Sequence, residues 1–231
     1  CVCVCARSSS ESPTKLPGTV DETADAARRE GARALAIPLD VRDEDAVADL
    51  AAKVYSEFGR CDLLVNNAAI AVPGPTLENS TKRWRLAVDI NVNGPLYLIW
   101  YLCTRMAENG EGRVVNISSS ASVHPQFGRI SYTVTKRALE AMTEGFAYEQ
   151  DGRVSHNCIR LELSVWSEGY AHTLGDQDFS DFEDPIILSD AVLWMAKQPL
   201  SYTGEVVTIE QLREKGIVRP KTRIADRDDW T

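Results

Sequence analysis

Short runs of apolar and β-branched residues alternate along this chain with longer segments of helical periodicity, and this alternation limits the possible folds more than any other feature. A strand, a helix and a second strand in succession are typical of parallel βαβ units. We therefore predict an α/β fold in which a doubly wound parallel sheet lies between two layers of helices. The predicted strands are residues 2–6, 34–39, 62–66, 113–118, 154–161 and 205–209.

The predicted helices have clear end signals. Asp43 is a good N-cap for a helix that runs through Phe58, and Gly59 follows its last residue. The longest helical stretch covers residues 81–109. Within it Pro95 has no N–H to offer the carbonyl of Asn91, so we expect a kink there. The other predicted helices are residues 20–30, 132–149 and 189–197.

A chain of 231 residues is large enough to bury the core of one domain. We predict a single domain over residues 1–210, followed by a charged peripheral tail over residues 211–231. The whole chain has 25 basic and 34 acidic residues, and their net charge of −9 would repel nucleic acid and anionic lipid. No apolar run approaches the roughly 20 residues needed to cross a membrane. We therefore expect a cytoplasmic protein with neither nucleic acid nor membrane as a partner.

Six cysteines are present, and the first three alternate along one predicted strand. Cys1, Cys3 and Cys5 therefore share one strand face, where their sulfurs are expected about 7 Å apart. That separation is too large for three ligands around one ion at about 2.3 Å, so buried apolar thiols are favoured over a metal site. The three histidines are scattered, and no metal site is predicted.

The strongest chemical signal is the spacing of Ser119, Tyr132 and Lys136. Tyr132 and Lys136 are four residues apart and share one helix face, where an ammonium group would lower the phenol pKa from about 10. A general acid/base at neutral pH needs such a shift. Ser119 ends a strand, where its hydroxyl can orient a substrate oxygen at the carboxyl edge of the sheet. Taken alone, the Tyr–Lys pair is equally typical of an amphipathic helix surface.

The serine spacing, the Asn-Ile-Ser-Ser run at residues 116–119 and the strand-then-helix context together resemble the classical short-chain dehydrogenase/reductase family. The resemblance extends from Val2 to about Ile209. It implies a Rossmann-type sheet and an NAD(P)-dependent enzyme that interconverts an alcohol and a ketone or aldehyde by hydride transfer. It also implies that Tyr132 is the general acid/base and that Lys136 also holds the nicotinamide ribose. The implied catalytic set is Asn91, Ser119, Tyr132 and Lys136.

The resemblance also covers residues that bind the cofactor in this family. The Asn-Asn-Ala-Ala run at residues 66–69 resembles the family's Asn-Asn-Ala-Gly element, and Asp40-Val41 resembles its Asp-Val pair. Arg7 follows the first strand, where a basic residue accommodates the 2′-phosphate of NADP and an acidic one binds the ribose of NAD. We therefore expect NADP, with NAD as the alternative and a solvated arginine as the bland interpretation of Arg7. The implied cofactor-binding residues are Arg7, Asp40, Val41, Asn67, Ala68, Ala69, Tyr132 and Lys136.

The segment at residues 166–184 occupies the place of the family's substrate loop. Ser119, Trp166 and Tyr170 are the predicted substrate residues, although the two aromatic residues are equally typical of packing anchors. The resemblance implies a small alcohol or carbonyl substrate. It also implies a homodimer or homotetramer formed through the helices at residues 81–109 and 132–149.

One departure from the family concerns its first βα unit. The family begins with a strand and a Thr-Gly-x-x-x-Gly-x-Gly loop that cradles pyrophosphate, and no such sequence occurs here. We expect a unit of about 30 residues to be missing, so that the domain is N-terminally incomplete. The family's strand order, 3-2-1-4-5-6-7, then puts the missing strand between residues 2–6 and 62–66. In the alternative, residues 2–6 take its place and residues 8–10 contact phosphate.

Two other functions stay open. The missing glycine loop favours a degenerate or truncated, non-catalytic family member that acts as a binding or assembly module. A nucleotide-sugar epimerase or dehydratase of the extended family is the third hypothesis, although the region after Lys136 leaves little room for a sugar-binding domain.

Overall fold

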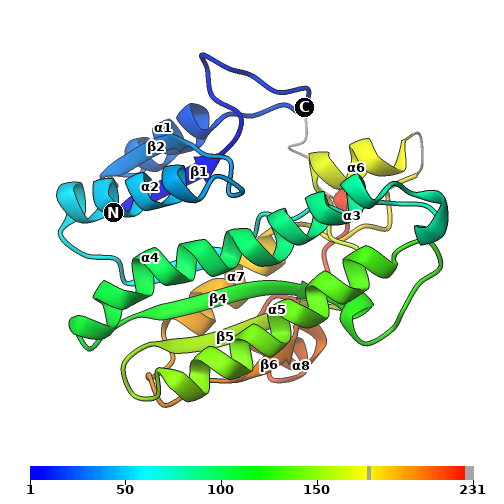
Figure 1. Ribbon diagram of the computed structural model, residues 1–231. Helices are drawn as coiled ribbons and strands as arrows, with labels where there is room; N and C mark the ends of the chain where they lie inside the picture. Colours follow the sequence, from blue (N-terminus) through cyan, green and yellow to red (C-terminus); the bar gives the residue numbers. More distant parts are fainter. Residues whose placement is uncertain (176–177, 227–231) are drawn as a thin grey trace.

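Parallel strands form the centre of the protein, in two neighbouring sheets (Figure 1). The computed structural model describes residues 1–175 and 178–226. In the smaller sheet, β1 (Val2–Ala6) pairs with β2 (Ala34–Pro38). The larger sheet has the order β3-β4-β5-β6. Its strands are β3 (Leu63–Asn66), β4 (Arg113–Ser119), β5 (Ser155–Leu161) and β6 (Val206–Thr208). All these pairings are parallel, which confirms the predicted fold class.

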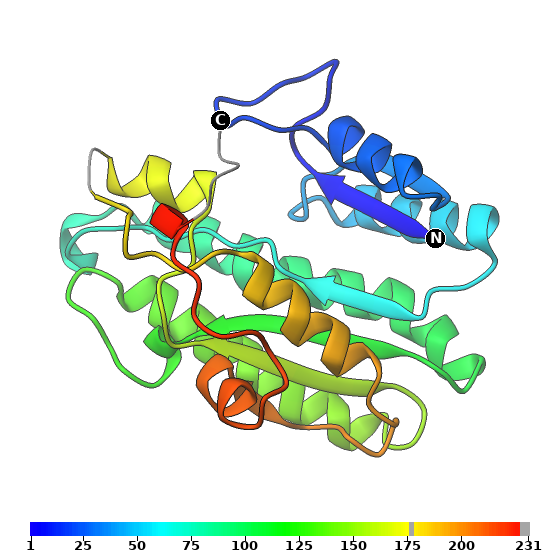
Figure 2. The same ribbon diagram turned by 180° about the vertical axis from the view of Figure 1, so that it is seen from behind.

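Helices cover both faces of the sheets, which gives the three layers of a Rossmann-type fold. Figure 2 shows α1 (Val20–Arg29) and α7 (Ile186–Ala196) on the near face. The far face carries α2 (Glu44–Phe58), α4 (Gly94–Glu108) and α5 (Ile130–Glu149). Shorter helices are α3 (Thr81–Val88), α6 (Glu168–Leu174) and α8 (Ile209–Glu214). Within the described ranges, no helix is both long and apolar enough to span a bilayer.

The sheet is interrupted between β1 and β3, at the position predicted for the missing strand. β1 pairs with β2 and not with β3, so the alternative in which residues 2–6 replace the first strand is wrong. The smaller sheet is instead held to the rest of the domain through α2, where Val47, Leu50 and Val54 form a core cluster against which Tyr97 and Leu98 of α4 pack.

The helix predicted over residues 81–109 is divided into three parts. α3 ends at Val88, a π-helical turn follows over Asp89–Asn93, and α4 begins at Gly94. In the π turn the Gly94 N–H donates to the Asp89 carbonyl five residues earlier. Pro95 is among the first residues of α4, where its missing N–H is best tolerated. The single continuous helix was therefore a wrong prediction, and the irregularity expected near Pro95 takes the form of a π turn.

The predicted peripheral tail is also corrected. Leu212 and Val218 are buried core residues that pack with α7. Arg219 forms an ion pair with Asp190 of α7, and the Ile224 N–H donates to the Phe182 carbonyl. Residues 211–226 are therefore integrated into the domain, because they cover its apolar surface. Residues 227–231 of the predicted tail lie outside the described residues.

The cysteines differ from their predicted environment. The Sγ atoms of Cys3 and Cys5 are 3.6 Å apart, not about 7 Å, because the two side chains lean toward each other on one strand face. Cys1 and Cys5 are exposed, whereas Cys103 and Cys158 are buried, and all six thiols are free. Among the described residues, no group of three or more His, Cys, Asp or Glu side chains is placed to hold a metal ion.

Candidate active site

Three polar side chains meet at the carboxyl end of β4. Ser119 is the last residue of this strand, and Tyr132 and Lys136 lie one turn apart near the start of α5. The Ser119 hydroxyl contacts the Tyr132 phenol, and Lys136 Nζ lies 5.5 Å from the centre of the Tyr132 ring. Residues that are separated in sequence thus form one cluster at the sheet edge where parallel α/β folds bind ligands.

The Lys136 side chain is anchored on the sheet. It is buried, and its Nζ donates a hydrogen bond of 2.6 Å to the backbone carbonyl of Ile117 in β4. Burial lowers the pKa of Lys136 to about 8 because an ammonium group loses hydration there. The amine is therefore held rigidly between β4 and α5, and it can titrate near neutral pH.

The pKa predicted for Tyr132 needs correction. Burial raises the pKa of Tyr132 above 10, although contact with Ser119 and the positive charge of Arg129 each lower it in part. The expected lowering by Lys136 is not found, since the lysine ammonium is itself desolvated and points to the Ile117 carbonyl. At neutral pH the Tyr132 phenol is consequently protonated.

Asn91 links the segment after β3 to α5. Its side chain is buried in the π turn, where Oδ1 accepts from the Ile70 N–H and Nδ2 donates to the Ile70 carbonyl, both at 2.8 Å. Nδ2 also donates to the Thr135 hydroxyl at 3.0 Å, one residue before Lys136. Asn91 therefore positions the backbone on both sides of the cluster. Its place in the implied catalytic set stays a prediction.

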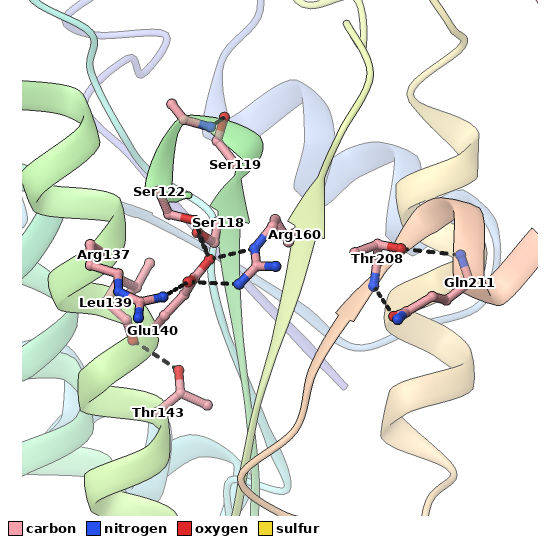
Figure 3. A network of polar contacts seen from close by, with 11 residues as sticks. Ser118, Ser119, Ser122, Arg137, Leu139, Glu140, Thr143, Arg160, Thr208 and Gln211 are labelled. Carbon is pink, nitrogen blue, oxygen red and sulfur yellow. Dashed lines mark hydrogen bonds and ion pairs between the residues drawn. The ribbon is translucent and has the colours of Figure 1, made fainter. Parts of the chain in front are cut away.

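A buried carboxylate that the sequence did not predict lies beside Ser118 and Ser122, next to Ser119 of the cluster (Figure 3). Glu140 follows Lys136 by one helical turn, and its side chain is 1% exposed. It accepts hydrogen bonds from Ser118 at 2.7 Å and from Ser122 at 2.6 Å. The Arg160 guanidinium of β5 donates to both carboxylate oxygens at 2.9 Å. This network joins β4, β5, α5 and the turn after β4.

The charge of Glu140 is stabilised by this network. Burial by itself raises the pKa of Glu140, but hydrogen bonds from Arg160, Ser122 and Ser118 outweigh it, and the net pKa is lowered. The carboxylate therefore stays ionised and fixes Ser118, the residue before Ser119. Arg160, a charged residue within the predicted strand at residues 154–161, is the sequence signal that could have indicated a buried acidic partner.

The predicted cofactor residues after β3 lie at the same sheet edge. Asn67, Ala68 and Ala69 are exposed. Just before them, Asn66 donates to the Asn116 side chain of β4 at 2.8 Å, and Asn116 donates to Thr143 of α5 at 2.9 Å. These hydrogen bonds hold the end of β3 against β4 and α5, and so they fix the position of residues 67–69, which follow β3 directly.

The other predicted cofactor residues lie on the smaller sheet. Arg7 is exposed directly after β1, and the carboxylate of Asp40 is bound by Arg42, with Nε to Oδ1 at 2.9 Å. This hydrogen bond is the main reason that the pKa of Asp40 is lowered, and Arg7 adds a weaker contribution. Val41 packs tightly on the backbone of Gly94, where an added Cβ would lie 2.8 Å from Val41 Cγ2. The interrupted sheet separates this group from the Tyr132 cluster.

The two predicted aromatic substrate residues have different surroundings. The Tyr170 ring of α6 lies 5.5 Å from the Phe182 ring and 5.8 Å from the Arg129 guanidinium, and its hydroxyl adds to the raised pKa of Tyr132. Trp166 is half-buried, and its backbone N–H donates to the Glu183 carbonyl. The structure thus brings Tyr170 to the cluster. Residues 176–177 of the predicted substrate loop lie outside the described residues.

Comparison with known proteins identifies the family. Residues 12–162 match the family model of the short chain dehydrogenases. Hydroxysteroid dehydrogenase-like protein 2 from Bos taurus is 28% identical over 218 residues, which are 93% of this chain and 52% of that protein. The chain thus spans about half the length of this curated relative. It belongs to the short-chain dehydrogenase family.

Solved structures share the fold. A candidate dehydrogenase from Xanthomonas campestris superposes with a TM-score of 0.83 at 25% identity, over 94% of this chain and 82% of that one. A gluconate 5-dehydrogenase from Burkholderia cenocepacia, solved with NADP and tartrate, has a TM-score of 0.77 at 20% identity, over 89% and 82% of the two chains.

Proposed function

We propose that this protein is an NAD(P)-dependent oxidoreductase that interconverts an alcohol and a ketone or aldehyde, with Tyr132 as the general acid/base. The observation that carries the proposal is the convergence of Ser119, Tyr132 and Lys136 at the carboxyl end of β4. Family membership supports it, because the similar proteins named above are dehydrogenases.

The roles of the three side chains follow from their chemistry. Ser119 donates a hydrogen bond to the substrate oxygen and holds it beside the Tyr132 hydroxyl. A phenol with a raised pKa is protonated at neutral pH, which is the form that donates a proton when a carbonyl is reduced. In the reverse direction the ionised form of Tyr132, its phenolate, takes the alcohol proton, and Lys136 would hold the nicotinamide ribose.

The residues at this edge fit a nicotinamide dinucleotide. The exposed residues 67–69 and the clustered side chains of Tyr132 and Lys136 lie at the same edge of the sheet. The bound dinucleotide supplies the hydride chemistry, while the protein contributes position and electrostatics. Arg7 is exposed, and its charge matches the 2′-phosphate that distinguishes NADP from NAD. NADP is therefore the proposed cofactor, with NAD as the alternative.

The decisive experiment compares Tyr132→Phe with the unaltered protein. We expect turnover on a panel of small carbonyls and alcohols to fall about 10²- to 10⁴-fold, because the variant has no proton to transfer. Binding of NADPH, followed by its fluorescence, should stay within about twofold, since the ring and its packing are kept. Tyr148→Phe is the matched control, because Tyr148 lies on the same helix and is exposed. Unchanged turnover in Tyr132→Phe would refute the assignment.

The interrupted sheet favours a second candidate function. β1 and β3 do not pair, and Arg7 and Asp40 are on the opposite side of the break from Tyr132. A degenerate or truncated family member that acts as a binding or assembly module fits this arrangement. Two measurements test this candidate. It is favoured over the enzyme if the protein does not change the fluorescence of NADPH and NADPH does not change the melting temperature of the protein.

Two further features belong to the proposal. Homodimer or homotetramer formation through α4 and α5 is supported on α4 by the exposed indole ring of Trp100. Sedimentation or light scattering measures the oligomeric state directly.

A cytoplasmic location stays a prediction from composition, and fluorescence microscopy of the tagged protein tests it.

A further inference from the structure

A positive charge outside the Ser119, Tyr132 and Lys136 cluster lies beside the Tyr132 phenol. Arg129 directly precedes α5, and Tyr132 is in the first turn of that helix. The guanidinium of Arg129 is close enough for its charge to lower the pKa of the phenol in part, whereas Lys136 donates to the Ile117 carbonyl instead. The positive potential at the Tyr132 hydroxyl therefore comes from a residue to which the sequence gave no role.

The backbone holds Arg129 in place on both sides. Its N–H donates to the Gln126 carbonyl at 3.2 Å, and its carbonyl accepts from the Thr133 N–H at 2.9 Å as α5 begins. The preceding residue, Gly128, has a φ of +71° and lies against Gly74 of the loop after β3, where an added Cβ would be 3.3 Å from backbone atoms. The start of α5 is thus packed closely on this loop.

Aromatic rings support the side chain of Arg129. Its guanidinium carbon lies 5.8 Å from the centre of the Tyr170 ring in α6. The Tyr170 ring lies 5.5 Å from that of Phe182, and the Phe179 ring meets Phe182 edge-on at 5.1 Å. A guanidinium over an aromatic face is held by attraction between its charge and the ring, while the N–H groups at its edge stay available for hydrogen bonds.

The N–H groups of this guanidinium have no protein acceptor. Other arginines of this acidic chain are bound to carboxylates, as Arg42 is to Asp40 and Arg219 is to Asp190. Within residues 1–175 and 178–226, Arg129 forms no ion pair and its side chain donates no hydrogen bond. It is nevertheless half-buried. A half-buried guanidinium with free donors is suited to bind an anion.

We propose that Arg129 binds a carboxylate of the substrate, so that the protein acts on hydroxy acids and the corresponding oxo acids. This substrate class rests on the proposed oxidoreductase function. A planar guanidinium can donate two parallel hydrogen bonds to a carboxylate. One guanidinium matches the single charge of a carboxylate, and Lys136, which could share the second charge of a phosphate, is buried and bonded to the Ile117 carbonyl.

The position of Arg129 also limits the length of the acid. Residues three apart at the start of a helix have their Cβ atoms about 5–6 Å apart, so the carboxyl group lies a few bonds from the carbon that reacts at Tyr132. The substrate is then bound at two points, its carboxylate by Arg129 and its reacting oxygen by Ser119. A neutral alcohol of the same shape leaves the half-buried guanidinium without a partner and binds less well.

The carboxylate itself is unchanged by the reaction. In oxidation, the C–H bond of the alcohol carbon breaks and its electron pair leaves as hydride to the oxidised nicotinamide. The hydroxyl proton passes to the Tyr132 phenolate, and the C=O bond of the oxo acid forms. Reduction is the reverse, with the proton donated by the Tyr132 phenol. Arg129 contributes binding and orientation in both directions.

The test compares oxo acids with their neutral amides in NADPH-dependent reduction. The panel is 2-oxobutanoate, 3-oxobutanoate and 4-oxopentanoate, each with its primary amide. We expect the unaltered protein to prefer at least one acid over its amide by about tenfold or more in kcat/KM. Arg129→Met should lower that preference about 10- to 100-fold, mainly through KM, because the carboxylate is bound equally in the ground and transition states. The ratio cancels any effect of the charge on Tyr132, since both substrates use the same phenol.

Two further variants serve as controls. Arg129→Lys should keep part of the preference, because an ammonium group keeps the charge but not the planar pair of donors. Arg153→Met removes an exposed arginine at the other end of α5, whose side chain donates to the Glu149 carbonyl, and it should leave the preference unchanged.

Several results would overturn the proposal. One is an acid-to-amide preference that Arg129→Met does not change, and another is faster turnover of a hydroxyalkyl phosphate than of the matched hydroxy acid. An equal fall for acid and amide, together with weaker NADPH binding, would assign Arg129 to the cofactor instead.

A binding measurement separates this proposal from the proposed function. If no acid or amide is turned over, the oxidoreductase function fails, but the carboxylate site can still be tested without cofactor. Propanoate is titrated into the protein while the Arg129 Nε–H signal is followed by NMR, with propanamide as the neutral control. A saturable shift with propanoate alone supports the site, and its absence would overturn it.

Discussion

Replacing Glu140 with alanine should be among the most damaging single changes in the domain. The substitution removes a 1% exposed carboxylate and leaves Arg160, which is 18% exposed, without its partner for two hydrogen bonds. The Ser118 and Ser122 hydroxyls lose their acceptor as well. Breaking a buried ion pair in this way costs about 3–5 kcal/mol of unfolding free energy. Because domains of this kind are stable by about 5–15 kcal/mol, the variant should lose about a fifth of its stability or more.

The same carboxylate should make stability depend on pH. The pKa of Glu140 in the folded protein is lowered, and in the unfolded chain it is about 4.3. Its contribution is therefore fully present above the unfolded value and is lost as the pH falls through the folded value. The difference in unfolding free energy between the unaltered protein and Glu140→Gln should be largest near pH 7 and should shrink below about pH 4.

Urea denaturation followed by circular dichroism measures these free energies. Glu144→Gln is the matched control, because Glu144 is exposed one turn later in α5 and its replacement should cost less than about 0.5 kcal/mol. The double variant with Arg160→Ala should cost less than the sum of the single changes, since the stranded guanidinium is removed. A Glu140→Ala variant within about 1 kcal/mol of the unaltered protein would refute the argument that this ion pair is buried and fully bonded.

Further expectations concern packing and titration elsewhere in the fold. Gly94→Ala should destabilise by about 1–3 kcal/mol in urea denaturation, because a Cβ would lie 2.8 Å from Val41 Cγ2. Gly145→Ala in α5, where a Cβ meets nothing within 4 Å, should instead stabilise by about 0.5–1 kcal/mol, and equal effects at both positions would contradict the packing. Burial lowers the pKa of His156 to about 4, so its imidazole should stay neutral in an NMR titration until that pH. Because this folded value lies below the unfolded value of about 6.5, His156 should make the protein lose stability as the pH falls from about 6.5 to 4, and a normal titration near 6.5 would contradict its burial.

Local signals in the sequence were sufficient for most elements of the fold. Asp43 caps α2, whose last residue is Phe58, and Gly59 follows in the left-handed conformation, as these residue types predict. The residues of α3 and α4 have an uninterrupted helical pattern, so periodicity alone could not show the π turn between them. A π turn depends on tertiary contacts, here those of the buried Asn91 side chain with Ile70 and Thr135.

The site was predictable only in part, for related reasons. The spacing of Ser119, Tyr132 and Lys136 was enough to place them together, since a strand end and one helix face fix their directions. The pKa of Tyr132 was not predictable from sequence. It depends on how deeply the phenol is buried and on the hydrogen bond that Lys136 donates to the Ile117 carbonyl. Glu140 was missed because its partners come from three other parts of the chain.

The attachment of the smaller sheet bears on how the domain unfolds. β1, α1 and β2 are joined to the remainder by the side-chain packing of α2 on α4, and no backbone ladder crosses the break between β1 and β3 in the described residues. Regions held by few buried contacts and no shared ladder open at lower free energy, so we expect the first forty residues to form a separate cooperative unit of low stability. Denaturation of this chain should therefore have two stages, with the N-terminal foldon opening first and the β3–β6 body melting later.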